Sequence, residues 1–168
     1  MLFCFTLCVQ FQRMDQEKFN FITQQYIPKF KSLTADKKGK WGRMNAQQMA
    51  EHVTLFFKVS VEKLRFDLAV PEEHLPKYKE FLYSDKQFRE NTKAPASVLG
   101  EDALPLRYTS MDEAVNNLQR SINEFVEFFK NNPDKKTLHP AFGELNFDEW
   151  VLLHYKHVTH HLRQFELM

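Results

Sequence analysis

The sequence contains few residues that break helices and few that form disulfide frameworks. Its 168 residues include four Gly, seven Pro and two Cys. Scarce Gly and Pro, with few runs of β-branched residues, favour helices over a β-sandwich or barrel. Cys4 and Cys8 both lie near the N-terminus. They therefore cannot frame a disulfide scaffold of the kind found in small secreted domains.

The chain also has no excess of charge of either sign. Its 23 Lys and Arg residues nearly balance 22 Asp and Glu residues, which gives a formal net charge of +1. This balance provides no overall electrostatic attraction for nucleic acid or for an anionic membrane. We therefore expect no nucleic-acid partner and no membrane partner, and we expect a cytoplasmic protein.

An apolar extension occupies residues 1–13, with the sequence MLFCFTLCVQFQR. It lacks the basic region and the small-residue cleavage site of a signal peptide, and it is too short to cross a bilayer. A weak signal peptide stays open as an alternative, but the residues from Met14 onward resemble a natural helix start, so we interpret the extension as lying upstream of the true start. We expect a single domain over residues 14–168, since hydrophobic residues make up 43% of the chain, enough for a sizeable core.

Four segments carry apolar residues at helical spacing. In the last three, an Asn or Ser is followed three residues later by Gln or Glu, which is the capping-box pattern of a helix start. Pro28 should kink the first helix or end its first half. The expected helices span residues 15–33, 45–64, 110–131 and 146 to near the C-terminus.

A long connection, residues 65–109, joins the second and third of these helices. It is several times longer than an ordinary loop, and such lengths are typical of a crossover or of an active-site lid. We expect a short helix at residues 72–83 inside it. The sequence therefore predicts an all-α fold, a four-helix bundle with one long connection.

Histidine is concentrated in the last expected helix, where four of the seven lie within residues 154–161. At about 100° per residue, His157 and His161 lie about 40° apart on the helical wheel and one turn apart along the axis. Such an i, i+4 pair can bind one metal ion. His154 falls on the same stripe and His160 on its edge. One helix face cannot supply a complete ligand shell, so a further ligand must come from elsewhere.

Three histidines outside this cluster are candidates for that ligand. His74 lies in a charged, exposed setting, and the position of His139, before Pro140, cannot be predicted. His52 lies on the apolar face of the second helix. A lone histidine there is more often a satisfied core residue than a ligand, but metal sites in bundles are built from facing helices. The His-rich last helix therefore favours His52 as the third ligand.

Two stretches of the sequence resemble one branch of the DinB superfamily, which also includes the YfiT-type metal-dependent hydrolases. The first is WGRMNAQQMAEH at residues 41–52. The second comprises HPAFGEL at 139–145, Trp150, and KHVTHHLRQF at 156–165. The resemblance implies a four-helix bundle that binds a divalent metal through one histidine of the second helix and an H-x-x-x-H pair of the fourth. The matching positions are His52, His157 and His161.

Three imidazoles leave a coordination position open, which is typical of a catalytic site. Neutral nitrogens suit Zn, Ni, Fe or Cu better than Mg or Ca. Hydrolysis requires a base, and Glu51, beside His52, points about 100° away from it. The resemblance also implies the transfer of low-molecular-weight thiols such as bacillithiol or mycothiol, which ionise near pH 8–9 and need less help from a base. Both reactions on a small-molecule substrate stay open.

Four further residues are candidates for contacts with the ligands or the substrate: His154, His160, Gln164 and His139. Gln164 shares the histidine stripe, whereas Arg163 points away from it. Two non-enzymatic alternatives also stay open. In the first, the protein is a metal-binding, stress-response or interaction bundle without catalysis. In the second, it is a switch whose histidines loosen the last helix near pH 6. The many Phe residues are compatible with a homodimer.

Overall fold

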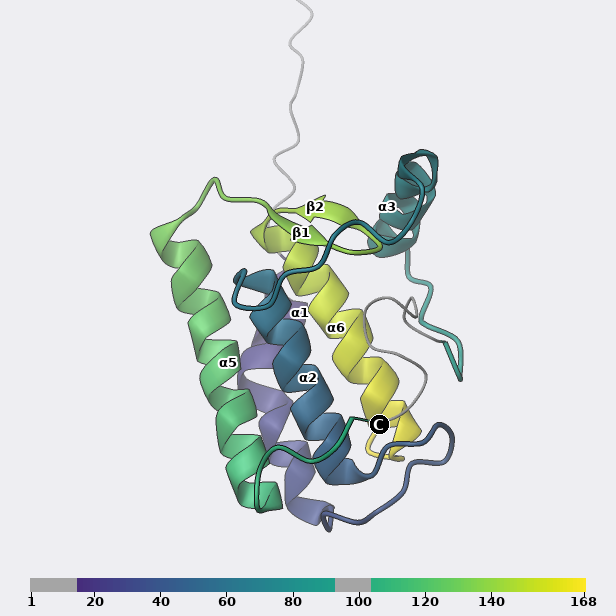
Figure 1. Ribbon diagram of the computed structural model, residues 1–168, viewed down its shortest axis with the longest axis vertical. Coiled ribbons are helices and arrows are strands. Elements are labelled where there is room, and N and C mark those ends of the chain that lie inside the picture. The colour runs from purple at the N-terminus through teal and green to yellow at the C-terminus, as the bar shows by residue number, and fades with distance from the viewer. Residues whose placement is uncertain (1–14, 93–103) are drawn as a thin grey trace, which may run out of the picture.

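The computed structural model describes residues 15–92 and 104–168. The expectations for Cys4, Cys8 and residues 1–13 lie outside the described residues. The fold is mainly helical, as predicted, and four long helical segments form a bundle (Figure 1). They are residues 16–32, α2 (Ala46–Ser60), α5 (Met111–Asn131) and α6 (Phe147–Gln164).

The first helical segment is irregular, and Pro28 explains part of this. It begins as an α-helix, α1 (Gln16–Asn20), passes through one π-helical stretch (Phe21–Gln25) and ends as a 3-10 helix (Ile27–Ser32). Pro28 lies in the first turn of the 3-10 helix. Because proline lacks an N–H and its ring crowds the preceding turn, a regular α-helix cannot continue through it. The expected interruption is confirmed.

Two of the three predicted capping boxes are complete. Asn45 of α2 and Asn146 of α6 each accept a hydrogen bond from the backbone N–H three residues on. In return, the Gln48 or Glu149 side chain accepts a hydrogen bond from the backbone N–H of the Asn. At α5 only one of the two hydrogen bonds of the predicted capping box forms. Ser110 accepts from Glu113 N, but the Glu113 carboxylate accepts from the backbone and hydroxyl of Thr109 instead.

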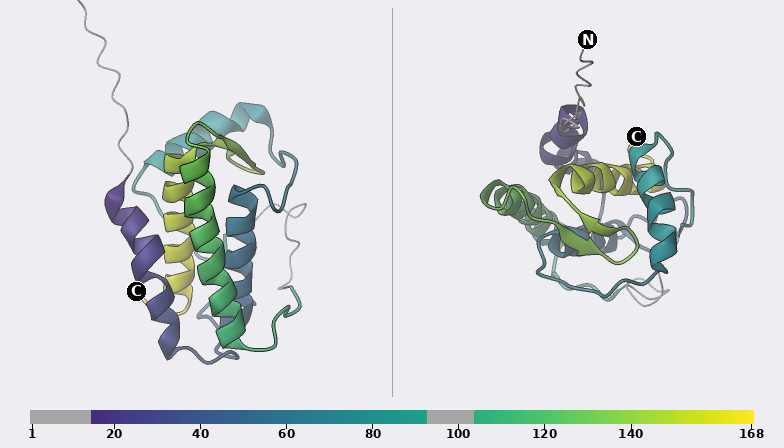
Figure 2. Two further views of the ribbon diagram at one scale, coloured as in Figure 1. Left: turned by 90° about the vertical axis from the view of Figure 1, so that its left-hand side faces the viewer. Right: turned by 90° about the horizontal axis from the view of Figure 1, so that it is seen from above.

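The long connection is a crossover, because α2 and α5 run in the same direction (Figure 1). Near their starts, Gln47 Nε2 donates to the carbonyl of Tyr108, 2.8 Å away. Near their ends, the Thr137 hydroxyl donates to the carbonyl of Ser60, 2.9 Å away. The first helical segment and α6 run the opposite way, and the views in Figure 2 show the four helices packed side by side. The helices α2 and α6 are therefore antiparallel neighbours.

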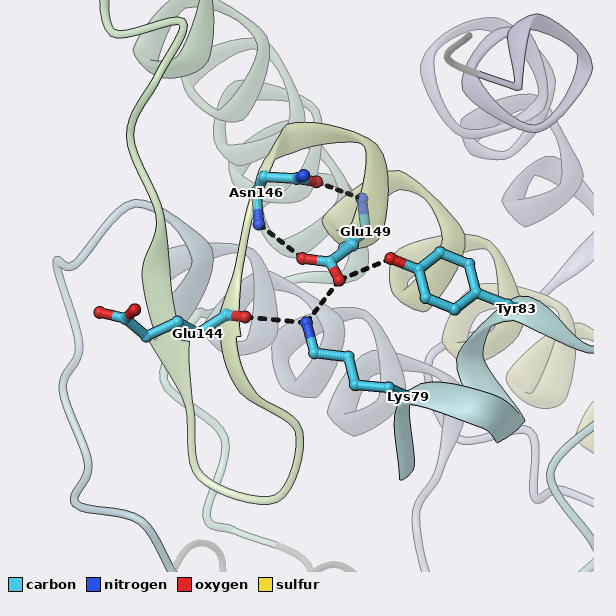
Figure 3. A network of polar contacts seen from close by, with 5 residues as sticks. All are labelled: Lys79, Tyr83, Glu144, Asn146 and Glu149. Carbon is cyan, nitrogen blue, oxygen red and sulfur yellow. Dashed lines mark hydrogen bonds and ion pairs between the residues drawn. The ribbon is translucent and has the colours of Figure 1, made fainter. Parts of the chain in front are cut away.

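Within the connection, a 3-10 turn (Glu72–His74) leads into α3 (Leu75–Tyr83). These elements coincide with the helix expected at residues 72–83. The α3 helix lies outside the bundle, close to the start of α6 (Figure 1). There Lys79 Nζ binds both the Glu149 carboxylate and the Glu144 carbonyl, and the Tyr83 hydroxyl donates to the same carboxylate (Figure 3). This network attaches α3 to the bundle.

A short β-hairpin precedes α6 and was not predicted. Its strands are β1 (Thr137–His139) and β2 (Gly143–Leu145), which pair antiparallel. The Thr137 hydroxyl, besides donating to Ser60, accepts from Trp150 Nε1 at 2.7 Å. The hairpin thus joins the end of α2 to the first turns of α6.

No helix among the described residues is long and apolar enough to cross a membrane.

Candidate metal centre

Three histidine rings from two helices converge on one point. His52 Nε2 on α2 lies 2.9 Å from His157 Nε2 on α6, and His161 Nε2 lies 3.0 Å from the same atom. All three ligand atoms lie within 4.8 Å of one another. Two imidazole nitrogens that bind one cation at about 2.0–2.1 Å stand about 3 Å apart, so this group could hold a metal ion.

The His157 ring is held between its neighbours by packing. It lies against the Phe56 ring, one turn after His52 on α2, with the ring centroids 4.2 Å apart. Its Nδ1 atom is buried and has no hydrogen-bond partner among the described residues. Aromatic contact, rather than a polar partner, therefore orients this ring toward the centre of the triad.

The His161 ring is instead oriented by a hydrogen bond from its Nδ1 to Gln164 Oε1, 2.8 Å away. The Gln164 amide is itself fixed, since its Nε2 donates to the carbonyl of Trp41 at 2.7 Å. The Gln164 oxygen must then accept from His161. This bond keeps the His161 proton on Nδ1 and leaves the lone pair of Nε2 directed at the triad.

The loop before α2 closes tightly around Gln164. Gly42 has a φ of +79°, in the left-handed region, and a Cβ atom there would lie 2.5 Å from Gln164 Nε2. A Cβ on Gly39 would lie 2.7 Å from the Gln164 side chain. Both glycines therefore permit an approach that any larger residue would block. The glycines of the WGRM stretch and its neighbourhood thus support the site through Gln164.

Burial keeps the three rings neutral near pH 7. It lowers the pKa of His52 to about 4, with a smaller contribution from His160. It also lowers the pKa of His157 and His161 well below the ordinary value, and the neighbouring histidines lower both further. A metal ion binds the neutral form of imidazole, so these shifts favour ligation.

His154 lies in the core, one turn before His157, and not beside the triad atoms. Its ring stacks on Phe57 with centroids 3.8 Å apart and also contacts Phe125 and Trp150. Its Nε2 lies 3.2 Å from the Ser60 hydroxyl. This histidine therefore joins α6 to the end of α2, and its contacts are those of a packing residue.

His160 belongs to a second stripe on α6, formed with Lys156 and Arg163, which we call the donor stripe. Lys156 Nζ donates to the carbonyls of Ser84 and Lys86, both at 2.6 Å. Arg163 donates to the Phe88 carbonyl at 3.1 Å, and His160 also bonds the Phe88 backbone. Alternate carbonyls of an extended segment face one side, so they match donors one turn apart on a helix. The donor stripe therefore holds residues 84–88 along α6.

The triad lies in the wall of a cavity of about 1250 Å³. Residues of α2, α3, α6 and the segment held by the donor stripe line it, including Phe56, Phe81 and Phe88. Among the described lining residues Glu51 is the only carboxylate. Its oxygens accept hydrogen bonds from Arg107 N, Tyr108 N and Gln47 Nε2 at 2.7–3.3 Å. Glu51 therefore anchors the end of the connection between α2 and α5. The sequence did not predict this role.

The remaining sequence candidates lie away from the triad atoms. His139 lines the cavity, but its Nδ1 accepts from Ala141 N and Phe142 N and so stabilises the hairpin turn. His74 is exposed at the edge of the cavity.

A family model described as the DinB superfamily matches residues 11–165. The chain belongs to the DinB superfamily. A search of the curated proteins and a search of the solved structures find no match. Membership agrees with the helical bundle and with the resemblance seen in residues 41–52 and 139–165. A metal-binding DinB-like protein also fits the three-histidine group.

Proposed function

We propose that this DinB-superfamily protein binds one divalent metal ion through His52, His157 and His161 and acts as a metal-dependent enzyme on a small molecule. The convergence of three Nε2 atoms in the wall of a large cavity is the observation that carries this proposal. Structural sites usually have four protein ligands, whereas three ligands beside a cavity leave room for a substrate. Zn, Ni, Fe or Cu suits three neutral nitrogens.

Between the two reactions, transfer of a low-molecular-weight thiol is favoured over hydrolysis. A hydrolase needs a base near the attacking water, and the only carboxylate among the described lining residues, Glu51, already accepts three hydrogen bonds. A thiol ionises more readily than water and needs less help from a base. A bound divalent cation would supply positive charge that favours the ionised sulfur.

The protein's own residues then have distinct tasks. His161 is oriented by Gln164, and His157 is oriented by Phe56. The donor stripe holds the cavity wall at Phe88. The low pKa values of the buried histidines argue against the alternative of a switch near pH 6, because their protonation would need a more acidic solution.

The test is turnover by the metal-loaded protein in parallel assays. One assay follows conjugation of low-molecular-weight thiols to an electrophile, and the other follows hydrolysis of esters and amides. We expect thiol conjugation that a chelator abolishes, that added metal restores, and that His161→Ala eliminates. Conjugation that survives both the chelator and His161→Ala would refute a metal-dependent reaction. Hydrolysis without conjugation would refute the preference for thiol transfer.

A further inference from the structure

The residues that line the cavity carry an excess of positive charge that the whole chain does not have. Among the described residues that line it, five are Lys or Arg, whereas Glu51 is the single carboxylate. The complete sequence has 23 basic and 22 acidic residues. Cations are therefore concentrated around this opening, although the protein is almost neutral.

Four of the five lining cations have no ion pair with a described residue. They are Lys77, Lys86, Arg89 and Arg107, and all four are exposed. The single negative charge of Glu51 can offset only one of these four positive charges. Four such cations raise the local concentration of anions at the mouth of an apolar cavity.

The deeper wall of the cavity is aromatic. Phe81 and Phe88 contact each other with ring centroids 5.1 Å apart, and Phe81 also contacts Phe142. Tyr78 packs edge-on against Phe142, and Phe56 lies beside the triad. Rings of this kind prefer offset or edge contacts with another flat apolar group. The wall therefore suits an aromatic or alkyl body, while the cations at the mouth suit an anionic group.

We propose that the cavity binds organic anions that combine a flat apolar body with one anionic group, a carboxylate or a phosphate ester. The body would lie against the wall of Phe81 and Phe88, with its charge toward the four exposed cations. This inference rests on the proposed function in one respect, since such an anion would be a substrate of the same site. The cations and the aromatic wall do not depend on a metal, so binding can be tested separately.

The experiment compares three probes with the same aromatic body, by fluorescence titration at low salt. They are 2-naphthylacetate, 2-naphthyl phosphate and the neutral 2-naphthaleneethanol. We expect at least one anion to bind about tenfold or more tightly than the alcohol, and the better anion identifies the head group. High salt should reduce the preference, since exposed charges are screened. Equal affinity for all three probes would overturn the proposal.

Matched variants locate the charges responsible. Lys77→Gln with Lys86→Gln removes two cavity cations, and Lys31→Gln with Lys136→Gln removes two exposed lysines elsewhere. The cavity pair should weaken anion binding about three- to tenfold and leave alcohol binding unchanged, whereas the control pair should change neither. Arg89→Gln with Arg107→Gln provides an independent second pair. Equal losses in cavity and control pairs would overturn the proposal.

Metal content, measured on the same samples, separates this inference from the proposed function. Metal retained in the cavity variants, together with a lost anion preference, supports both. An anion preference in a protein that binds no metal would contradict the proposed function alone. Metal binding without an anion preference would contradict this inference alone.

Discussion

The His161 ring donates from Nδ1 to Gln164 Oε1, and the Gln164 amide in turn donates to the carbonyl of Trp41. One side chain thus connects the loop before α2 to a candidate metal ligand on α6. Because this bond fixes which ring nitrogen carries the proton, it keeps the other nitrogen available to a cation. Gln164 is therefore a positioning residue for the triad.

The first prediction concerns Gln164→Leu. The change removes the acceptor for the His161 proton, so we expect metal affinity to fall by about 10- to 100-fold, as is usual for such supporting contacts. Competition with a coloured chelator measures it. Gln87→Leu is the control, because Gln87 lines the same cavity but contacts Thr159. Equal metal affinities of Gln164→Leu and Gln87→Leu would contradict this role.

A second prediction concerns the donor stripe, through Lys156→Met. The Lys156 ammonium donates to two carbonyls of residues 84–88, and a charged group hydrogen-bonded in this way contributes up to about 3 kcal/mol. We expect a loss of about 1–3 kcal/mol in the free energy of unfolding and faster hydrogen exchange at residues 84–88. Lys130→Met, on an exposed position of α5, should leave both unchanged. Unaltered exchange at 84–88 in Lys156→Met would refute the proposed anchoring.

The third prediction is a pH dependence that comes from His139. Burial lowers its pKa to about 3, so below pH 6.5 the unfolded chain binds a proton that the folded chain does not. Its contribution to stability is complete above pH 6.5 and is lost as the pH falls toward 3. At pH 5 the loss is about 2 kcal/mol for an ordinary unfolded pKa of about 6.5.

His139→Asn tests this prediction, since its side-chain oxygen can accept the same backbone N–H groups but does not titrate. Urea unfolding at pH 7 and pH 5 should show a drop in stability about 2 kcal/mol smaller for the variant than for the wild type. Parallel losses in the two proteins would mean that His139 is not the group responsible.

The sequence predicted the helices and the pairing of His157 with His161 because both depend on local periodicity. Residues within one or two turns are enough to predict the caps at Asn45 and Asn146 and the interruption at Pro28. The same holds for the pairing of His157 with His161. His52 was chosen because the His-rich last helix required a further ligand from a facing helix, and the family resemblance supported the same choice.

The features that were missed depend on contacts between segments far apart in the chain. The hairpin at 137–145 is too short for a periodic signal and is held by Trp150 and Ser60. The bonds from Lys156 and His160 to residues 84–88 also join distant segments, as does the bond from Glu51 to Arg107. The donors Lys156, His160 and Arg163, one turn apart on a helix, were visible in the sequence. Their acceptors are backbone carbonyls, which carry no sequence signature.

The central claim is that His52, from α2, completes a metal site with His157 and His161 of α6. Elemental analysis of the purified wild type, His52→Ala, His157→Ala and the control His74→Ala tests it most directly. The account predicts about one divalent metal ion per chain in the wild type and His74→Ala, and almost none in the other two. Equal metal content in all four proteins would contradict it.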